Sequence, residues 1–427
     1  MTTSNLQARL ASAVDQNFER QVAWLATLVQ FPSLRGQEAP CQDWIAREFT
    51  ARQWAVDRYT LAEVPMSHLP GFSPIVDADY TRAVQVVASL RPRAPKGKSL
   101  ILQGHVDVVP TGPAASWAAP PFAATIKDGR MIGRGANDMK SGVAAMVFAL
   151  DALRSLGLRP AADVYVQTVT EEESTGNGAL STLARGYRAD ACLIPEPTSG
   201  NILRATIGVM WFRLRISGRP AHVSESERGT NAILSAFALI EALRGHTREL
   251  NERVKPDPWF GRIPNAIKFN PGKIAGGDWA SSTPAWCEVD CRIGVLPGMT
   301  LAAFREELTG VVMAAARQDP FLADNPPDIV WNGFQADPYV LEPGGAFEAA
   351  VRAAARHVVG EEPVETILPA VTDCRFYGRY YDIPSLSYGA SGSGSHGFDE
   401  SVELESIRRV TKVIAVLIAD WCGVETI

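Results

Sequence analysis

A histidine and an aspartate two residues apart, His105 and Asp107, form the first chemically suggestive pair in the sequence. They lie in the segment GHVDVVP, directly after the apolar run of residues 99–103, which predicts a short buried strand. A histidine ring nitrogen can bind a metal ion while a carboxylate accepts a hydrogen bond from the other ring nitrogen. Taken alone, the pair also fits a loop histidine beside a capping aspartate, so its function depends on companions elsewhere in the chain.

Carboxylates occupy three further strand ends or turns. Asp138 lies in the glycine-rich turn GRGANDMK before an alanine-rich helix, where an aspartate can also serve only as a helix cap. Three consecutive glutamates, residues 171–173, follow the strand predicted for residues 164–168, and Glu196 ends a third strand between two prolines. Adjacent carboxylates repel one another. They therefore need a nearby cation unless the turn is fully solvated.

His396 completes the set from the Gly/Ser-rich loop SGSGSHG. In open α/β sheets ligands gather at the carboxyl ends of strands, so one sheet edge can collect these side chains. Imidazole and carboxylate ligands without thiolates suit zinc, with cobalt or manganese as substitutes. Two divalent ions, three carboxylates and a bridging hydroxide also sum to zero charge. The sequence therefore predicts a site for two divalent metal ions, zinc by preference, with the ligands His105, Asp138, Glu173, Glu196 and His396.

The elements that must position these residues alternate between helix and strand, which predicts an α/β fold with a mostly parallel sheet and helices on both faces. From about residue 208 the order changes to strand, helix, strand, strand, helix, strand, typical of a self-contained α+β unit. We therefore expect a catalytic domain formed by residues 1–207 and 336–427, interrupted by an inserted lid or dimerisation domain formed by residues 208–335.

Length and composition limit the classes of protein. A chain of 427 residues exceeds the usual size of one hydrophobic core, which agrees with two domains. A net charge of -6 gives no basic surface for nucleic acid or a membrane. The start MTTSNLQARL lacks the pattern of an export signal, and no apolar run approaches the roughly 20 residues of a membrane span. We expect a cytoplasmic protein whose six scattered cysteines are free thiols.

Five motifs together resemble those of a known enzyme family. GHVDVVP, GRGANDMKSG, the acidic triplet before STGNGA, PEPT and a late loop histidine are similar in order and spacing to the zinc-dependent acetylornithine deacetylase, succinyl-diaminopimelate desuccinylase, aminoacylase and glutamate carboxypeptidase family. The resemblance covers nearly the whole chain and is nearest to the bacterial acetylornithine deacetylase-like branch. It implies a metallopeptidase-family hydrolase that cleaves the C–N amide bond of a small N-acyl amino acid or a similar carboxylate-bearing substrate.

The resemblance also implies a role for each residue of the metal centre. His105 and Glu196 would bind one ion, His396 and Glu173 would bind the other, and Asp138 would bridge them. Glu172 would be the general base that forms the zinc-bridged hydroxide, and Asp107 would orient His105. The position of Gly178, five residues after Glu173, sets the register, and a shift by one to Glu171 is the alternative. The family further implies a cis peptide between Asp138 and Met139.

The predicted inserted domain carries three family marks. By resemblance, His222 in RPAHVS would stabilise the oxyanion in the neighbouring subunit of a homodimer. Asn270 and Arg292 match positions that bind the substrate carboxylate and the tetrahedral intermediate, a task for which the planar guanidinium fork is suited. One departure from the family is Ser141 after Lys140, where a glycine is usual, and it weakens any transfer of substrate identity.

Two rival functions remain open at this point. An aminohydrolase releasing ammonia from an aryl or amidine carbon would use the same metal centre, with Trp279, Trp286 and Phe376 forming a flat pocket. An assay that separates ammonia from free acid would distinguish it. A non-catalytic, metal-stabilised or peptide-binding protein would lack the base, whereas Glu172 is present.

Overall fold

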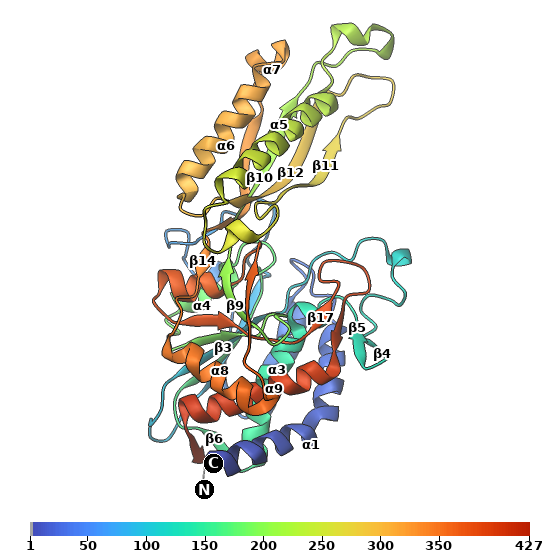
Figure 1. The fold of residues 1–427 in the computed structure, drawn as a ribbon. Helices are drawn as coiled ribbons and strands as arrows, with labels where there is room; N and C mark the ends of the chain where they lie inside the picture. Colours follow the sequence, from blue (N-terminus) through green and yellow to red (C-terminus); the bar gives the residue numbers. More distant parts are fainter. Residues whose placement is uncertain (1–2) are drawn as a thin grey trace.

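The computed structural model describes residues 3–427 and shows two parts, a larger one and a smaller one that projects from its end. The larger part contains both chain ends and a central sheet, and the smaller part extends away from it as a narrow layer of strands and helices (Figure 1). The smaller part is formed by the green-yellow to orange middle of the chain (Figure 1). A segment from the middle of the sequence therefore interrupts the larger part.

The central sheet has six strands in the order β1-β2-β7-β3-β8-β16. Strands β7, β3, β8 and β16 are parallel, while β1 and β2 pair antiparallel at one edge. The mostly parallel sheet is confirmed, and the antiparallel edge was not predicted. The strands are β1 (Ala55–Thr60), β2 (Val84–Leu90), β3 (Leu100–His105), β7 (Val164–Val169), β8 (Cys192–Ile194) and β16 (Ser385–Ser387).

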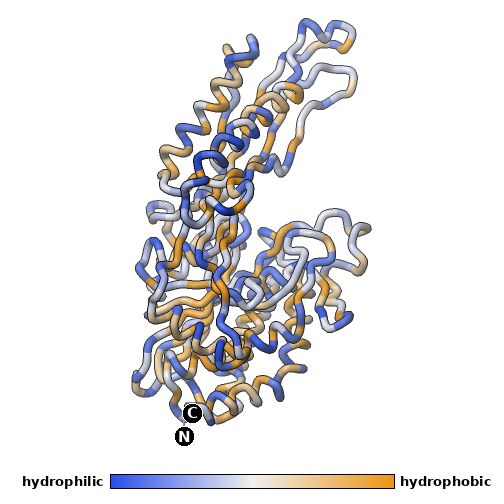
Figure 2. The backbone as a smooth tube through the Cα atoms, in the orientation of Figure 1, coloured by the Kyte–Doolittle hydropathy of each residue, from blue (hydrophilic) through white to orange (hydrophobic). Residues whose placement is uncertain are grey.

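Helices cover both faces of this sheet because its strands are buried on both sides. In β3, Leu100 and Leu102 belong to the core under α1, α3 and α9, whereas Ile101 belongs to the core that contains α4. Figure 2 shows these helices with alternating apolar and hydrophilic segments, as helices with one buried face require. The helices of this part are α1 (Thr3–Val29), α2 (Ala39–Ala51), α3 (Ser141–Ser155), α4 (Asn177–Ala184), α8 (Ala346–Val359) and α9 (Leu404–Cys422).

The smaller part is an antiparallel sheet in the order β11-β12-β10-β13, covered by α5 and α6 and enclosing its own apolar core. Its chain order confirms the predicted strand, helix, strand, strand, helix, strand pattern, with the short α7 added before the last strand. Its elements are β10 (Gly208–Ser217), α5 (Ala232–Arg253), β11 (Phe269–Gly276), β12 (Trp286–Val295), α6 (Leu301–Ala316), α7 (Pro320–Asp324) and β13 (Asp328–Ala336).

Three small sheets connect or flank these parts. The sheet β14-β9-β15 leads from the larger part to the smaller one, β17-β18-β5-β4 carries the Gly/Ser-rich loop, and β19 pairs with β6 near the C-terminus. Their strands are β4 (Thr125–Lys127), β5 (Arg130–Ile132), β6 (Leu158–Pro160), β9 (Ile202–Thr206), β14 (Tyr339–Val340), β15 (Glu365–Leu368), β17 (Gly392–Ser393), β18 (Ser401–Glu403) and β19 (Val424–Thr426). Within residues 3–427, every helix is too short or too polar to cross a membrane.

Candidate metal centre and active site

His105 is the last residue of β3 and its ring is fully buried. Its Nδ1 lies 3.0 Å from the backbone carbonyl oxygen of Asp107, while the Asp107 carboxylate is 3.6 Å away. A carbonyl can only accept, so Nδ1 carries the proton and Nε2 keeps a free lone pair. The nearer contact of Asp107 with His105 is thus through its backbone carbonyl rather than through its side chain.

Asp138 stands between the two predicted histidine ligands. It lies in a π-helical turn, η3 (Ala136–Lys140), and the peptide bond to Met139 is cis, as the resemblance implied. One oxygen of its carboxylate is 3.2 Å from His105 Nε2 and the other is 3.7 Å from His396 Nε2. A single carboxylate thus reaches both imidazoles, which is the geometry of a bridging ligand.

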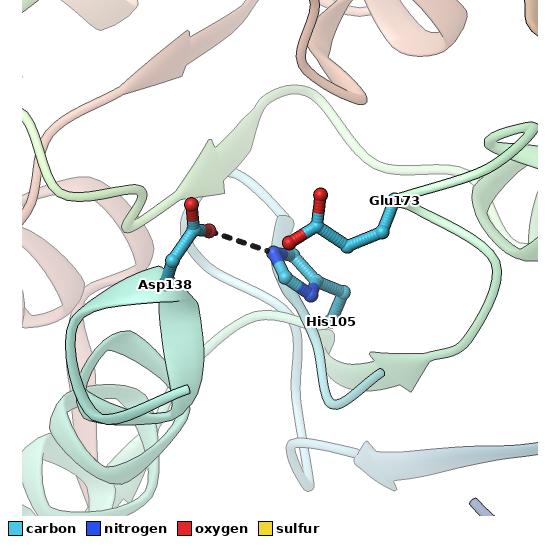
Figure 3. A group of neighbouring side chains, drawn as sticks. All are labelled: His105, Asp138 and Glu173. Carbon is cyan, nitrogen blue, oxygen red and sulfur yellow. Dashed lines mark hydrogen bonds and ion pairs between the residues drawn. The ribbon is translucent and has the colours of Figure 1, made fainter. Parts of the chain in front are cut away.

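Glu173 and Glu196 lie on opposite sides of this bridge. Glu173 contacts His396 Nε2 at 3.1 Å, whereas Glu196 lies 3.9 Å from His105 Nε2. Figure 3 shows the Asp138 and Glu173 carboxylates pointing toward the ring of His105. One ligand atom from each of His105, Asp138 and Glu173 lies within 4.8 Å of the others. The predicted ligands, which lie at the end of β3, after β7, after β8 and in two distant turns or loops, therefore converge.

The charges of this cluster fit a bound divalent cation. Burial, together with neighbouring carboxylates, raises the pKa of Glu172 and Glu196 well above the usual range, although His105 opposes the shift. The hydrogen bond to Glu173 raises the pKa of His396 to about 9, with a further contribution from Asp138. Carboxylates and imidazoles this close compete for protons unless a cation compensates the negative charge. The donor set of two nitrogens and several carboxylate oxygens matches zinc.

The side chains of the acidic triplet lie in two different surroundings. Glu172 and Glu173 line the central cavity, and their backbone N–H groups donate to the Asp107 carboxylate at 3.4 and 3.1 Å. The side chain of Glu171 instead accepts hydrogen bonds from Arg35 and other neighbours, and it does not line the cavity. This geometry favours the register with Glu172 as base and Glu173 as ligand over the shift by one.

A cavity of about 860 Å³ extends from this cluster to the smaller part of the molecule. Asn270 of β11 and Arg292 of β12 line it and face each other in the strand register. The Arg292 guanidinium donates only to the carbonyls of Lys268 and Pro369, both at 3.3 Å, among the described residues. Burial lowers the pKa of Arg292, so an anionic substrate group would find a partly desolvated cation without a carboxylate partner.

Other predicted residues lie outside this cavity. His222 is exposed and immediately precedes the turn η4 (Val223–Arg228). The prediction that Trp279, Trp286 and Phe376 shape the pocket is wrong. Trp279 is 74% exposed, and Phe376 is buried in the core next to α4. Trp211 and Phe334 line the cavity instead.

Sequence reasoning missed the residues that hold the turn carrying Asp138. Glu400 accepts hydrogen bonds from the backbone N–H groups of Asn137 and Asp138, both at 3.0 Å. The same carboxylate pairs with Arg134 at 2.6 Å, and both side chains are buried. The only available signal was Arg134 inside the motif GRGANDMK, because an arginine beside a buried turn needs an acidic partner.

The fold and the site together define a metal-dependent hydrolase with a cavity between two parts of one chain. Residues 101–420 match the model of peptidase family M20/M25/M40, and the chain belongs to this family. It is therefore a hydrolase of amide C–N bonds.

Several proteins are similar to this chain over most of their length. The N-formyl-4-amino-5-aminomethyl-2-methylpyrimidine deformylase of Halalkalibacterium halodurans is 27% identical over 438 residues, covering 97% of each chain. A succinyl-diaminopimelate desuccinylase of Bradyrhizobium is 29% identical over 339 residues, 74% of this chain and 82% of its own. The di-peptidase Dug1p of Saccharomyces cerevisiae has the same fold, with a TM-score of 0.78 at 15% identity over 99% of both chains.

Proposed function

We propose that this protein removes a short acyl group from a small, carboxylate-bearing amide by using two divalent metal ions, with zinc as the best fit. The observation that carries the proposal is Asp138, whose two carboxylate oxygens face His105 and His396 separately. Glu196 beside His105 and Glu173 beside His396 would complete the two ligand sets. When bound, divalent ions polarise an amide carbonyl and acidify water.

Glu172 is the proposed general base. It lines the cavity beside Glu173, among the proposed metal ligands. A carboxylate in this place can take a proton from the attacking water and hold it until the amine leaves. Water adds to the acyl carbon, the C–N bond breaks, and the proton on Glu172 passes to the amine nitrogen. The products are a carboxylic acid and an amine.

Arg292 and Asn270 would bind the substrate carboxylate at the other end of the cavity. Their place in the lining supports this role, as does the lack of a carboxylate partner for Arg292 among the described residues. The deformylase and the desuccinylase named above remove one-carbon and four-carbon acyl groups, as their names state. We therefore propose a short acyl group on the substrate nitrogen.

A homodimer through the smaller part would bring His222 to the active site of the partner subunit. β11 is an edge strand, and α5 beside it exposes Leu234 and Phe237, with 65% and 54% of each residue accessible. Exposed apolar side chains next to an open sheet edge are a surface that a second copy can cover. All six cysteines are free and buried, which agrees with a reducing cytoplasm.

A replacement of the base tests the proposal. Glu172→Gln should lower kcat by about 10²–10⁴-fold while elemental analysis still finds two metal ions per chain. Glu19→Gln, on the exposed side of α1, is the matched control and should leave kcat unchanged. The substrates are N-formyl, N-acetyl and N-succinyl amino acids, with free acid and ammonia measured in parallel. Full activity of the Glu172 variant, or release of ammonia alone, would overturn the proposal.

A further inference from the structure

One wall of the cavity is apolar and lies away from the proposed metal ligands. It is formed by side chains of β9, β10, β13 and β15 and of the segment that follows β15, namely Leu203, Val209, Trp211, Phe334, Ile367 and Val371. The wall faces the same space as Arg292 and Glu172. A substrate held by its carboxylate and its amide would therefore lay its remaining atoms against apolar side chains.

Trp211 and Phe334 form the rigid centre of this wall. Their rings meet edge to face, with centroids 5.2 Å apart and an interplanar angle of 86°. The strand register between β10 and β13 shifts beside Trp211, as in a β-bulge, which can redirect a side chain. Gly333 has a φ of +79°, and a Cβ atom there would lie 2.5 Å from the Trp211 ring. Only glycine lets the indole pack this closely on the backbone.

The charges around the cavity disfavour an ammonium group on the substrate. The carboxylates that line it are Asp138, Glu172, Glu173 and Glu196, all within the proposed metal centre. No other acidic side chain among the described residues lines this space. An ammonium group on the amine half of the substrate would be desolvated against Trp211 and Phe334 without a partner, which is costly.

We propose that the substrate is the N-acyl derivative of an amino acid with a large apolar or aromatic side chain, and not of a diamino acid. The side chain would lie against Trp211 and Phe334 while Arg292 binds the carboxylate. This inference rests on the proposed function, because it requires the amide to be hydrolysed at the same site. Trp211 would then be a residue that determines specificity.

Specificity constants for one acyl group on four amino acids test this inference. N-formyl derivatives of phenylalanine, leucine, alanine and ornithine should show kcat/KM for phenylalanine about 100-fold above alanine and ornithine, since a single methylene in an apolar pocket changes kcat/KM by about 10–200-fold. Trp211→Ala should reduce the phenylalanine to alanine ratio at least about tenfold. Gly333→Ala, which displaces the indole, should shift the ratio in the same direction.

The matched control is Trp331→Ala. Trp331 lies on the neighbouring strand and packs on Phe212, 5.6 Å between ring centroids, and it does not line the cavity. This variant should keep the wild-type ratio of kcat/KM for the phenylalanine and alanine compounds. The ratio does not depend on the amount of folded enzyme, so partial unfolding of a variant does not change it. Equal turnover of the ornithine and phenylalanine compounds, or an unchanged ratio in Trp211→Ala, would overturn the inference. Failure to hydrolyse any N-acyl amino acid would overturn the proposed function itself.

Discussion

Arg35 holds Glu171 through two hydrogen bonds, from Nε to Oε1 at 2.5 Å and from Nη2 to Oε2 at 2.8 Å. Tyr80 and Thr175 donate to the same carboxylate at 3.0 and 2.9 Å, and Glu171 has a left-handed backbone with a φ of 71°. These contacts turn the first acid of the triplet away from the cavity. The next two residues of the triplet can then project into it.

Removal of the Arg35 side chain should therefore impair catalysis without removing any proposed metal ligand. Arg35→Ala frees the Glu171 carboxylate, so the turn that carries Glu172 loses its anchor, and kcat should fall about 10–100-fold with a small change in KM. Arg35→Lys keeps the positive charge but loses the two-point contact, so its kcat should lie between those of the wild type and Arg35→Ala. Arg58→Ala removes an exposed pair with Asp43 and serves as control. An unchanged kcat in Arg35→Ala would show that the Arg35–Glu171 contact does not position Glu172.

Glu400 supports the turn that carries Asp138, a proposed metal ligand. Glu400→Gln keeps the shape of the side chain but leaves buried Arg134 without its counter-charge and weakens the hydrogen bonds from Asn137 and Asp138. Metal affinity should fall about 10–100-fold, as is typical when a group behind a ligand is lost. Glu400→Ala should also lower the free energy of unfolding by about 3–5 kcal/mol.

Metal titration and chemical unfolding measure these two effects. Glu403→Gln is the control, because Glu403 pairs with Arg130 but has 45% of its side chain exposed. An exposed ion pair contributes about 0–1 kcal/mol, so this variant should behave like the wild type. Equal metal affinity in the Glu400 and Glu403 variants would show that the buried pair does not hold the turn.

The sequence predicted the parts of the site that follow strand ends. His105 and Glu196 could be located because a short apolar run ends immediately before the motif in each case, and parallel strands end at one edge. The order of elements in the smaller part followed from alternating patterns of the same kind. Signals of this type can be read from the sequence alone because they depend only on residues that are neighbours in the chain.

Contacts between distant segments could not be predicted in this way. Nothing near Glu400 indicates that it pairs with Arg134, since the two are joined only by the folded chain. The aromatic residues of the cavity were misassigned for the same reason. Trp279 lies in the exposed loop between β11 and β12, whereas Trp211 lies on β10 beside a shift of register with β13, and composition reveals neither. The antiparallel strands β1 and β2 were missed because they carry no motif.

Glu38 should make stability depend on pH. It is 1% exposed, its Oε2 has no hydrogen-bond partner among the described residues, and burial raises its pKa to about 7. Between pH 4.5 and 7 the folded protein holds this proton more tightly than the unfolded chain. The contribution of Glu38 to the free energy of unfolding therefore decreases as the pH rises through this window, by about 3 kcal/mol in total.

Glu38→Gln removes this titration and should be the more stable protein at pH 8, with the difference vanishing near pH 4.5. Urea unfolding of both proteins at several pH values measures it, and Glu19→Gln serves as the exposed control. A difference between Glu38→Gln and wild type that does not change with pH would contradict the raised pKa of Glu38.

Mixing of two inactive variants tests whether His222 acts in the partner subunit. His222→Ala and Glu172→Gln should each be inactive as homodimers, because every active site then lacks one group. After unfolding and refolding together at equal amounts, half of the dimers are mixed, and each contains one site with an intact Glu172 and the partner's intact histidine. Activity should return to about one quarter of wild type for a two-fold dimer.

If His222 instead acted within its own chain, each subunit would lack one essential group, and the mixture would stay inactive. The exposed position of His222, outside the cavity of its own chain, favours the first outcome.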